Sequence, residues 1–293
     1  MTDESEVYDH IRSGGSGFYE QKRGLIAVSG KEGVQFLDGM ITNDMKTLAD
    51  GAQMLAAFPN AQGRLLAVIR VLRQGERFLI ETEEVTREKV FQNLFRFTFA
   101  GDFFVEDLSD QYRYFELFGD NLEPLLTCGL AFVNRKSSGY FAPFGASLPK
   151  DFIQIPDEVY ETLRIENGIP KYGVDMDETT IVPELGLDDM ISYNKGCYIG
   201  QEIIARIHFR GHVAKRLTGI VSEPGAIATG FLPGAELTNT DGKNAGKITS
   251  VTFSPKLDKT VALAFVRYDY LVAGTELMAG ETKAVVTDLP FVS

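Results

Sequence analysis

The sequence predicts an α+β fold with a separate small β-barrel at its C-terminal end, and three observations support this prediction. Predicted strands occur in runs that helices interrupt, rather than in a regular alternation of strand and helix. After about residue 217, only short strands and frequent turns remain. The 293 residues, 44% of them hydrophobic, are sufficient for one large core or two to three modest cores.

The N-terminal half begins with a strand, a helix and a strand meander. Residues 25–28 form an apolar strand, and Ser29-Gly30-Lys31-Glu32 then has the S-x-x-E form of a capping box that opens a helix. A phosphate loop at Gly30-Lys31 is the weaker interpretation, because the full spacing of that motif is absent. The elements expected next are strands at 54–58, 65–72 and 78–81, a helix over 83–97, and strands at 103–105 and 112–118.

The second half is expected to contain two helices followed by the barrel. Asp157 opens one helix, which Gly168 and Pro170 end in the usual C-terminal order. A loop-rich stretch to residue 194 and a helix over 203–209 come next. The barrel strands are expected at 217–221, 235–237, 246–253, 261–266 and 283–287. This pattern divides the chain into residues 1–212 and residues 213–293.

Composition restricts the class of protein. The chain has 29 Lys and Arg against 41 Asp and Glu, and a net charge of -12 opposes broad attraction to nucleic acid or anionic membranes. No apolar stretch approaches the length of a membrane span, and the first ten residues are acidic, unlike a secretory signal. The two cysteines form no C-x-x-C pair, so neither a disulfide framework nor a self-contained metal site is expected. We therefore expect a soluble cytoplasmic protein without a membrane partner.

The most informative run is residues 195–202, Lys-Gly-Cys-Tyr-Ile-Gly-Gln-Glu, directly before a predicted helix. Unpaired N–H groups at a helix start and the charge of Lys195 both favour the thiolate form of Cys197. Flanking glycines leave the backbone open to a ligand or partner. A buried, inert Cys197 is the alternative, since free cysteine is usually buried. Cys128 lies among apolar residues and is expected to be structural.

Basic residues follow this motif in an otherwise acidic chain: Arg206, Arg210, Lys215 and Arg216, with His208 and His212. They are suited to receive an anion. Cations near a helix C-terminus also complement the helix dipole, so both interpretations stay open. Gly211 is expected to end the helix between the two histidines, which disfavours a metal pair there.

The octapeptide at 195–202 closely resembles the K-G-C-Y-[TI]-G-Q-E signature of the YgfZ family, relatives of the glycine-cleavage T-protein. Other segments resemble the same superfamily and together cover nearly the whole chain, although only the octapeptide is specific to the YgfZ branch. These segments are Phe36-Leu37-Asp38-Gly39 with Thr42-Asn43-Asp44, Gln62-Gly63-Arg64, residues 164–170 with the R-x-E-x-G-x-P pattern, and the barrel segments 246–251, Ser254-Pro255 and 262–264.

The resemblance implies a T-protein-like three-lobed ring, with two interleaved α+β subdomains in residues 1–212, that binds tetrahydrofolate. It implies a role in maturation or repair of iron-sulfur enzymes, through transient contacts with client proteins or cluster-assembly factors, and links to one-carbon metabolism and tRNA modification. Cys197 with Lys195 would form the reactive site. Glu166 would contact the pterin, because a carboxylate accepts two hydrogen bonds from its N–H groups; a helix-surface charge is the alternative. Asn43, Tyr172, Arg206 and Arg210 are the remaining expected folate contacts.

One departure from the family pattern bears on activity. T-proteins place a catalytic aspartate a few residues after the hairpin glycine, and residues 63–69 contain no carboxylate. Aminomethyl transfer by that mechanism is therefore not expected, and whether the chain is an enzyme stays open. The competing hypotheses are a one-carbon transferase that uses Asp44 or Asp175 as its base, and a non-catalytic folate-binding module.

Overall fold

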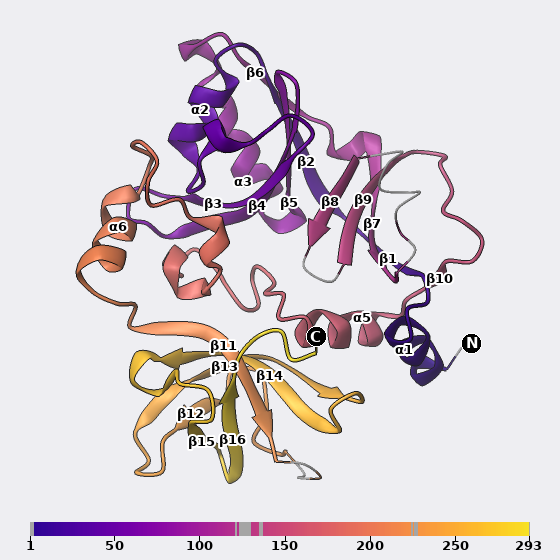
Figure 1. The fold of residues 1–293 in the computed structure, drawn as a ribbon, viewed down its shortest axis with the longest axis vertical. Helices are drawn as coiled ribbons and strands as arrows, with labels where there is room; N and C mark the ends of the chain where they lie inside the picture. Colours follow the sequence, from indigo (N-terminus) through magenta and orange to yellow (C-terminus); the bar gives the residue numbers. More distant parts are fainter. Residues whose placement is uncertain are drawn as a thin grey trace. The chain divides into compact units, whose positions relative to one another are not determined.

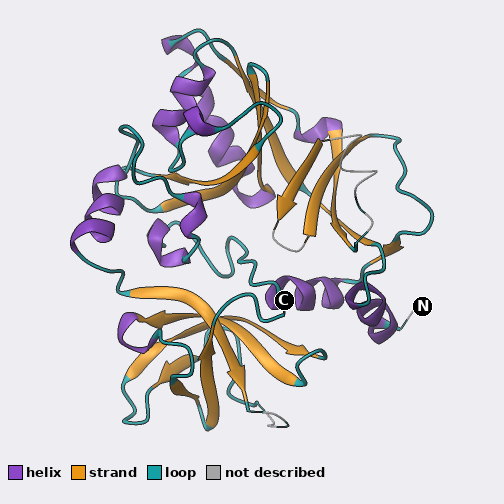
Figure 2. Cartoon of the chain, in the orientation of Figure 1, coloured by secondary structure: helices purple, strands orange, loops and turns teal. Residues whose placement is uncertain are grey.

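A computed structural model describes residues 3–120, 122, 130–134, 137–223, 225 and 228–292. Its described part is a mixed α+β structure with three sheets, one of which is a closed six-stranded barrel (Figures 1 and 2). This arrangement confirms the predicted fold class. None of the described helices has the length and apolar character needed to cross a bilayer.

Helices and strands alternate irregularly along the chain. The helices are α1 (Glu4–Arg12), α2 (Gly33–Met40), α3 (Glu84–Phe95), α5 (Asp157–Glu166) and α6 (Gln201–Arg210), and short 3-10 turns include η1 (Met45–Thr47), η4 (Val182–Leu185) and η5 (Asp188–Met190). One open sheet has the order β3 (Gln53–Pro59), β4 (Leu65–Gln74), β5 (Arg77–Glu83), β2 (Arg23–Ser29), β6 (Phe104–Asp107). The other has the order β10 (Ile153–Gln154), β1 (Gly17–Gln21), β7 (Tyr112–Phe118), β9 (Ser137–Pro143), β8 (Leu130–Asn134).

The sheet that contains the predicted meander has an apolar layer on each face. One face packs against α2 and α3, where Leu37, Ile41 and Val90 are fully buried with strand residues such as Ile69. The opposite face, through Leu25 and Leu79, packs against aromatic residues of the second open sheet, including Phe132 and Phe141. Because both faces are covered, the central strands are rich in buried apolar residues rather than alternating ones.

The barrel closes in the order β11 (Lys215–Ser222), β14 (Lys259–Arg267), β13 (Asn244–Ser254), β12 (Glu236–Thr238), β15 (Glu276–Ala279), β16 (Thr282–Thr287). Its interior is filled by apolar side chains such as Ile220, Leu277 and Val286. Closure pairs every strand with two neighbours, which removes unpaired sheet edges.

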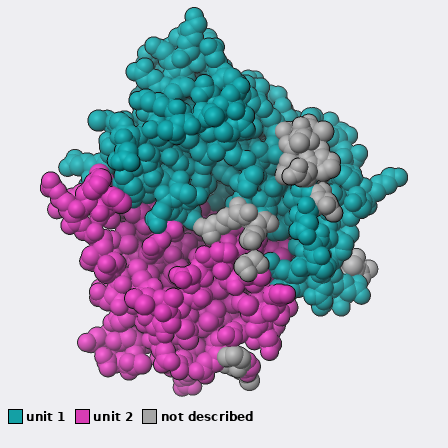
Figure 3. All heavy atoms as spheres, in the orientation of Figure 1, with its two compact units in different colours: residues 1–159, 187–203 teal, residues 160–186, 204–293 magenta. Residues whose placement is uncertain are grey.

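The chain separates into two compact units, coloured in Figure 3. Unit 1 comprises residues 1–159 and 187–203, and unit 2 comprises residues 160–186 and 204–293. The barrel strands begin at Lys215, close to the boundary expected after residue 212. The division nevertheless differs from a single boundary, because residues 160–186 group with the barrel. Arg164, for example, donates a hydrogen bond to Ser250 of β13 at 2.9 Å.

The capping box expected at residues 29–32 is wrong. Ser29 still belongs to β2, where it pairs with Arg77 of β5 and Phe104 of β6. The helix begins four residues later, at Gly33, and Glu32 makes no side-chain cap. Its carboxylate instead accepts a hydrogen bond from the backbone N–H of Asp102 at 2.7 Å. Strand pairing has prevailed over the local capping signal.

Candidate functional site

The loop that contains Cys197 is tied along its length to the segment that follows α2. We call residues 187–200 the Cys197 loop; it belongs to unit 1. The hydroxyl of Thr42 donates to the carbonyl of Met190 at 2.6 Å, and the N–H of Ser192 donates to the carbonyl of Thr42 at 3.0 Å. The side-chain amide of Asn43 donates to the carbonyls of Asp189 and Leu55. These bonds secure the first half of the loop.

Lys195 secures the second half. Its side chain is fully buried, and its ammonium donates to the carbonyls of Asp38, Ile41 and Asn43 at 2.5, 3.0 and 2.8 Å. The same ammonium lies 3.1 Å from Oδ1 of Asp38 and 5.0 Å from the centre of the Tyr198 ring. Burial lowers the pKa of Lys195, while the hydrogen bond and charge of Asp38 oppose that change.

Two of the carbonyl groups that Lys195 contacts, those of Asp38 and Ile41, come from the C-terminal end of α2, where backbone carbonyls lack helical partners and partial negative charge collects; the third, that of Asn43, comes from the segment after the helix. A buried ammonium is stable there only because three carbonyls and one carboxylate replace its water. The structure thus gives Lys195 a positioning role in the loop.

The end of the loop approaches the β3–β4 turn so closely that a glycine is required. Ile199 donates its N–H to the carbonyl of Gly39 at 3.1 Å. Gly200 has φ of +82°, and a Cβ added there would lie 2.3 Å from the carbonyl oxygen of Asn60. A larger residue at position 200 would therefore push the loop away from the turn.

These anchors leave Cys197 exposed in the loop, with α6 beginning four residues later at Gln201. Tyr198, next to it, is buried, and burial together with nearby Tyr193 raises the pKa of Tyr198 to about 12. The exposed position agrees with the expectation of an accessible thiol rather than a buried, inert one. Cys128 lies outside the described residues.

The convergence of three separate motifs is the main feature of the site. The octapeptide, the segment around Asp38 to Asp44 and the turn around Gly63 were each recognised separately in the sequence, and in unit 1 they meet at the Cys197 loop. Sequence reasoning assigned no role to Asp38 or Thr42. The available signal for Asp38 was its position as the one charged residue of the motif Phe36-Leu37-Asp38-Gly39.

Glu166 belongs to unit 2 and is fully buried. Its carboxylate accepts a hydrogen bond from the hydroxyl of Ser254, and its backbone carbonyl accepts one from the N–H of Phe291 at 2.8 Å. Position 166 therefore differs from the helix-surface charge that was the alternative interpretation. The helix α5 ends at Glu166, and Gly168, two residues later, has the left-handed conformation that is typical after a helix C-terminus.

Next to Glu166 in unit 2 lies a network centred on Asp175. Arg164 donates to Asp175 at 2.8 Å, and the hydroxyls of Thr249 and Ser250 donate to the same carboxylate at 2.5 and 2.6 Å. The N–H of Lys171 adds a further bond at 2.9 Å. Asp175 is 1% exposed, so its oxygen atoms are already occupied by structural partners.

The other expected site residues occupy varied positions. Tyr172 is half-buried and forms a backbone bridge with Met176. Arg206 and Arg210 are exposed on α6. His212 stacks on Tyr268 at 3.7 Å, and across the described ranges no three His, Cys, Asp or Glu side chains group as metal ligands.

Two of the positions considered for a catalytic base contribute to the folded structure instead, one in the core and one as a helix cap. Ala67, near the place of the expected T-protein aspartate, is fully buried in the core between α2, α3 and the meander. Asp44 caps η1 by accepting the N–H of Lys46 at 2.9 Å.

Two domain families match the chain. Residues 6–134 match the GCVT N-terminal domain, and residues 215–293 match the glycine cleavage T-protein C-terminal barrel domain. The second match coincides with the barrel from β11 onward. The C-terminal match therefore agrees with the observed barrel.

Curated relatives include both kinds of protein that the motifs suggested. The mitochondrial iron-sulfur cluster assembly factor IBA57 homolog of Mycosarcoma maydis is 30% identical over 218 residues, which is 67% of this chain and 54% of that protein. The chain thus matches about half the length of this relative. An aminomethyltransferase of Thermotoga petrophila is 28% identical over 284 residues, covering 83% of this chain and 76% of the enzyme.

The fold agrees with a solved structure of the same superfamily. The crystal structure of glycine cleavage system aminomethyltransferase T from Bartonella henselae superimposes with a TM-score of 0.85, covering 98% of this chain and 89% of that one at 21% identity. This likeness establishes a T-protein-like fold. Together with the two matched domains and the relatives, it shows that the chain belongs to the YgfZ/GcvT-like family.

Proposed function

We propose that this protein is a tetrahydrofolate-binding accessory factor for the maturation or repair of iron-sulfur enzymes, with Cys197 as its functional thiol. The observation that carries the proposal is the exposed Cys197 on a loop held by the buried Lys195–Asp38 contact. The family of the chain and its resemblance to an iron-sulfur cluster assembly factor support the same role.

The loop is organised to present a thiol rather than to bury it. Thr42, Asn43 and Lys195 fix the backbone on both sides, while the side chain of Cys197 stays open to solvent. An anchored, accessible thiol can contact a partner thiol or a cluster without first rearranging the loop, which limits the entropy lost on binding. One cysteine cannot supply the four ligands of a typical cluster, so we propose transient contact.

Folate is the proposed cofactor. Glu166 is the proposed pterin contact, with Asn43, Tyr172, Arg206 and Arg210 as further candidates. The carboxylate of Glu166 accepts a hydrogen bond from Ser254 and is fully buried, so a pterin that contacts this group must displace side chains that cover it. Asn43 already donates to two carbonyls, which favours a role in holding the loop.

The function is tested by complementation in a cell that lacks its own factor of this class. We expect the wild-type chain and Cys128→Ser to restore iron-sulfur enzyme activity, and Cys197→Ser to fail at equal expression. Calorimetry of tetrahydrofolate binding to purified Cys197→Ser checks that this variant is folded. Full rescue by Cys197→Ser would mean that the sulfur performs no chemistry and that the loop serves only as a binding surface.

Aminomethyl transfer is the competing function, and it is considered because several relatives are aminomethyltransferases. Buried Ala67, the capping role of Asp44 and the occupied oxygens of Asp175 all disfavour it. We expect no turnover of an aminomethylated carrier protein; turnover at about 1 per second or faster would favour the transferase. A cytoplasmic location and a role in tRNA modification stay predictions.

A further inference from the structure

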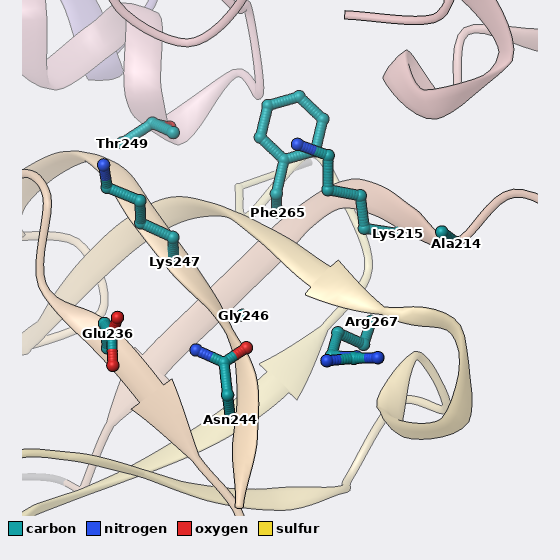
Figure 4. A pocket seen from close by; sticks show the side chains of 9 residues that line it. All are labelled: Ala214, Lys215, Glu236, Asn244, Gly246, Lys247, Thr249, Phe265 and Arg267. Carbon is teal, nitrogen blue, oxygen red and sulfur yellow. The ribbon is translucent and has the colours of Figure 1, made fainter.

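A pocket of about 320 Å³ lies on the outer face of the barrel, apart from the residues assigned above to folate or to the thiol. Four neighbouring strands contribute to it: Lys215 from β11, Phe265 and Arg267 from β14, Asn244 and Lys247 from β13, and Glu236 from β12 (Figure 4). We propose that this pocket binds a small phosphate monoester that also carries hydroxyl groups, a ligand of the sugar-phosphate or polyol-phosphate class.

Strand register explains why these side chains meet. Lys215 lies directly opposite Arg267, and Phe265 lies directly opposite Lys247, which in turn is opposite Glu236. Directly opposed residues on one face of antiparallel strands have Cβ atoms about 5 Å apart. Their chain neighbours Val266, Ile248 and Leu237 point into the barrel core, so the pocket residues point outward.

The pocket is positively charged in an acidic protein. Its three cations and one carboxylate leave a net charge of +2, whereas the whole chain has a net charge of -12. None of the three cations forms a direct ion pair in the described part of the chain, although the charge of Lys215 helps to lower the pKa of Asp177 and its ammonium lies 4.6 Å from the centre of the Phe265 ring. Elsewhere in the barrel, Lys283 pairs with two glutamates. Lys247 and Arg267 are thus the pocket cations most available to an anion.

The polar groups favour a phosphate monoester with hydroxyls. A phosphate monoester carries up to two negative charges at neutral pH, which matches the charge of the pocket. The planar guanidinium of Arg267 can bind two phosphate oxygens at once. In Figure 4 the ammonium of Lys215 overlies the Phe265 ring and Lys247 stands apart from it, with its ammonium toward Thr249. Glu236 and Asn244 supply acceptors for ligand hydroxyls. The volume is near the lower limit of small-molecule sites, so a sugar phosphate fits better than a nucleotide.

Calorimetry on the full chain tests the proposal with three probes: glycerol 3-phosphate, inorganic phosphate and glycerol. We expect glycerol 3-phosphate to bind more tightly than inorganic phosphate, and glycerol alone not to bind. Removing one charge-assisted contact, in Arg267→Gln or Lys247→Gln, should weaken binding of both phosphates roughly tenfold. Lys243→Gln is the matched control, since it removes an exposed cation of the same hairpin that does not line the pocket.

Glu236→Gln separates the two halves of the proposal. It removes a negative charge and a hydroxyl acceptor, so inorganic phosphate should bind more tightly while the preference for glycerol 3-phosphate decreases. No binding of either phosphate in the millimolar range, or an equal loss in Lys243→Gln, would overturn the proposal. An unchanged preference in Glu236→Gln would overturn the assignment of the hydroxyl contact. The four substituted side chains, Glu236, Lys243, Lys247 and Arg267, are exposed, so we expect the variants to fold. Thermal unfolding of each variant checks that it does.

Discussion

Lys195 and Lys46 contact the same carboxylate, that of Asp38, from opposite environments. The ammonium of Lys195 lies 3.1 Å from Oδ1 and its side chain is fully buried, whereas the ammonium of Lys46 lies 3.6 Å from Oδ2 and its side chain is 65% exposed. Only the buried lysine also binds three backbone carbonyls. Substituting each lysine in turn therefore compares a buried contact with an exposed one at the same carboxylate.

Lys195→Met should destabilise the protein strongly, while Lys46→Met should have little effect. Loss of the buried lysine leaves three carbonyls without their donor and takes from Asp38 its buried cation, although Lys46 and the N–H of Met45 still contact that carboxylate. We expect a cost of roughly 3 kcal/mol of unfolding free energy. Loss of the exposed lysine should cost at most about 1 kcal/mol. Urea unfolding of both variants measures the difference. Equal losses would show that the depth of the Lys195 contact is unimportant.

Buried charge in unit 1 predicts how stability responds to acid. Burial tends to raise the pKa of Glu81, but the charges of Arg23 and Arg70, bonded to its oxygens at 2.5 and 2.7 Å, lower it from 4.5 overall. A carboxylate whose pKa is lower in the folded state stabilises that state above its unfolded pKa, and this stabilisation disappears as pH falls through the folded value. Stability should therefore decline as pH falls below 4.5.

Glu81→Gln tests that account. It leaves the buried Arg70 without its carboxylate and the half-buried Arg23 with only the more distant Glu83, which should cost roughly 3 kcal/mol at neutral pH. The acid-induced decline in unfolding free energy should also become shallower. Glu20→Gln is the control, because its ion pair with Arg113 is exposed on both sides. A steep acid decline that persists in Glu81→Gln would assign the pH dependence to other carboxylates.

Cys197 should react with limiting iodoacetamide on the folded protein near neutral pH, because its side chain is exposed on an anchored loop. Mass spectrometry of peptides locates the label, and we expect Cys197 to be modified well before Cys128. Unfolding in urea should equalise the two rates. Equal labelling in the folded protein would contradict the proposed difference between the cysteines.

Glu166→Ala should weaken tetrahydrofolate binding by about 1.5 to 3 kcal/mol, since a charge-assisted contact with the pterin is lost. Ser254→Ala is the matched variant: it removes the internal partner of Glu166, so folate affinity should hold or rise while stability falls. Calorimetry measures affinity, and urea unfolding measures stability. If both substitutions reduce stability and neither changes affinity, Glu166 is a structural group only.

Local patterns were sufficient where an element carries its own signal. The meander β3–β4–β5, the helices α3, α5 and α6, and five of the six barrel strands appear where apolar periodicity and turn residues predicted them. The second open sheet was recognised only at β7. Its β9 contains Ser137, a polar residue that is buried because its hydroxyl donates to Glu116 of β7. Such a strand has no apolar alternation to read.

The sequence by itself determined the fold class, the barrel and the identity of the Cys197 motif, because these depend on residue spacing within short segments. Only the tertiary structure decided what the motif residues do. Lys195 is 157 positions from Asp38, and its ammonium contacts that carboxylate and the carbonyls at and after the C-terminal end of α2. Buried polar groups need hydrogen-bond partners in place of the water that they lose. Which groups are buried together at such a sequence separation depends on the folded structure, so the contact could not be predicted from local sequence.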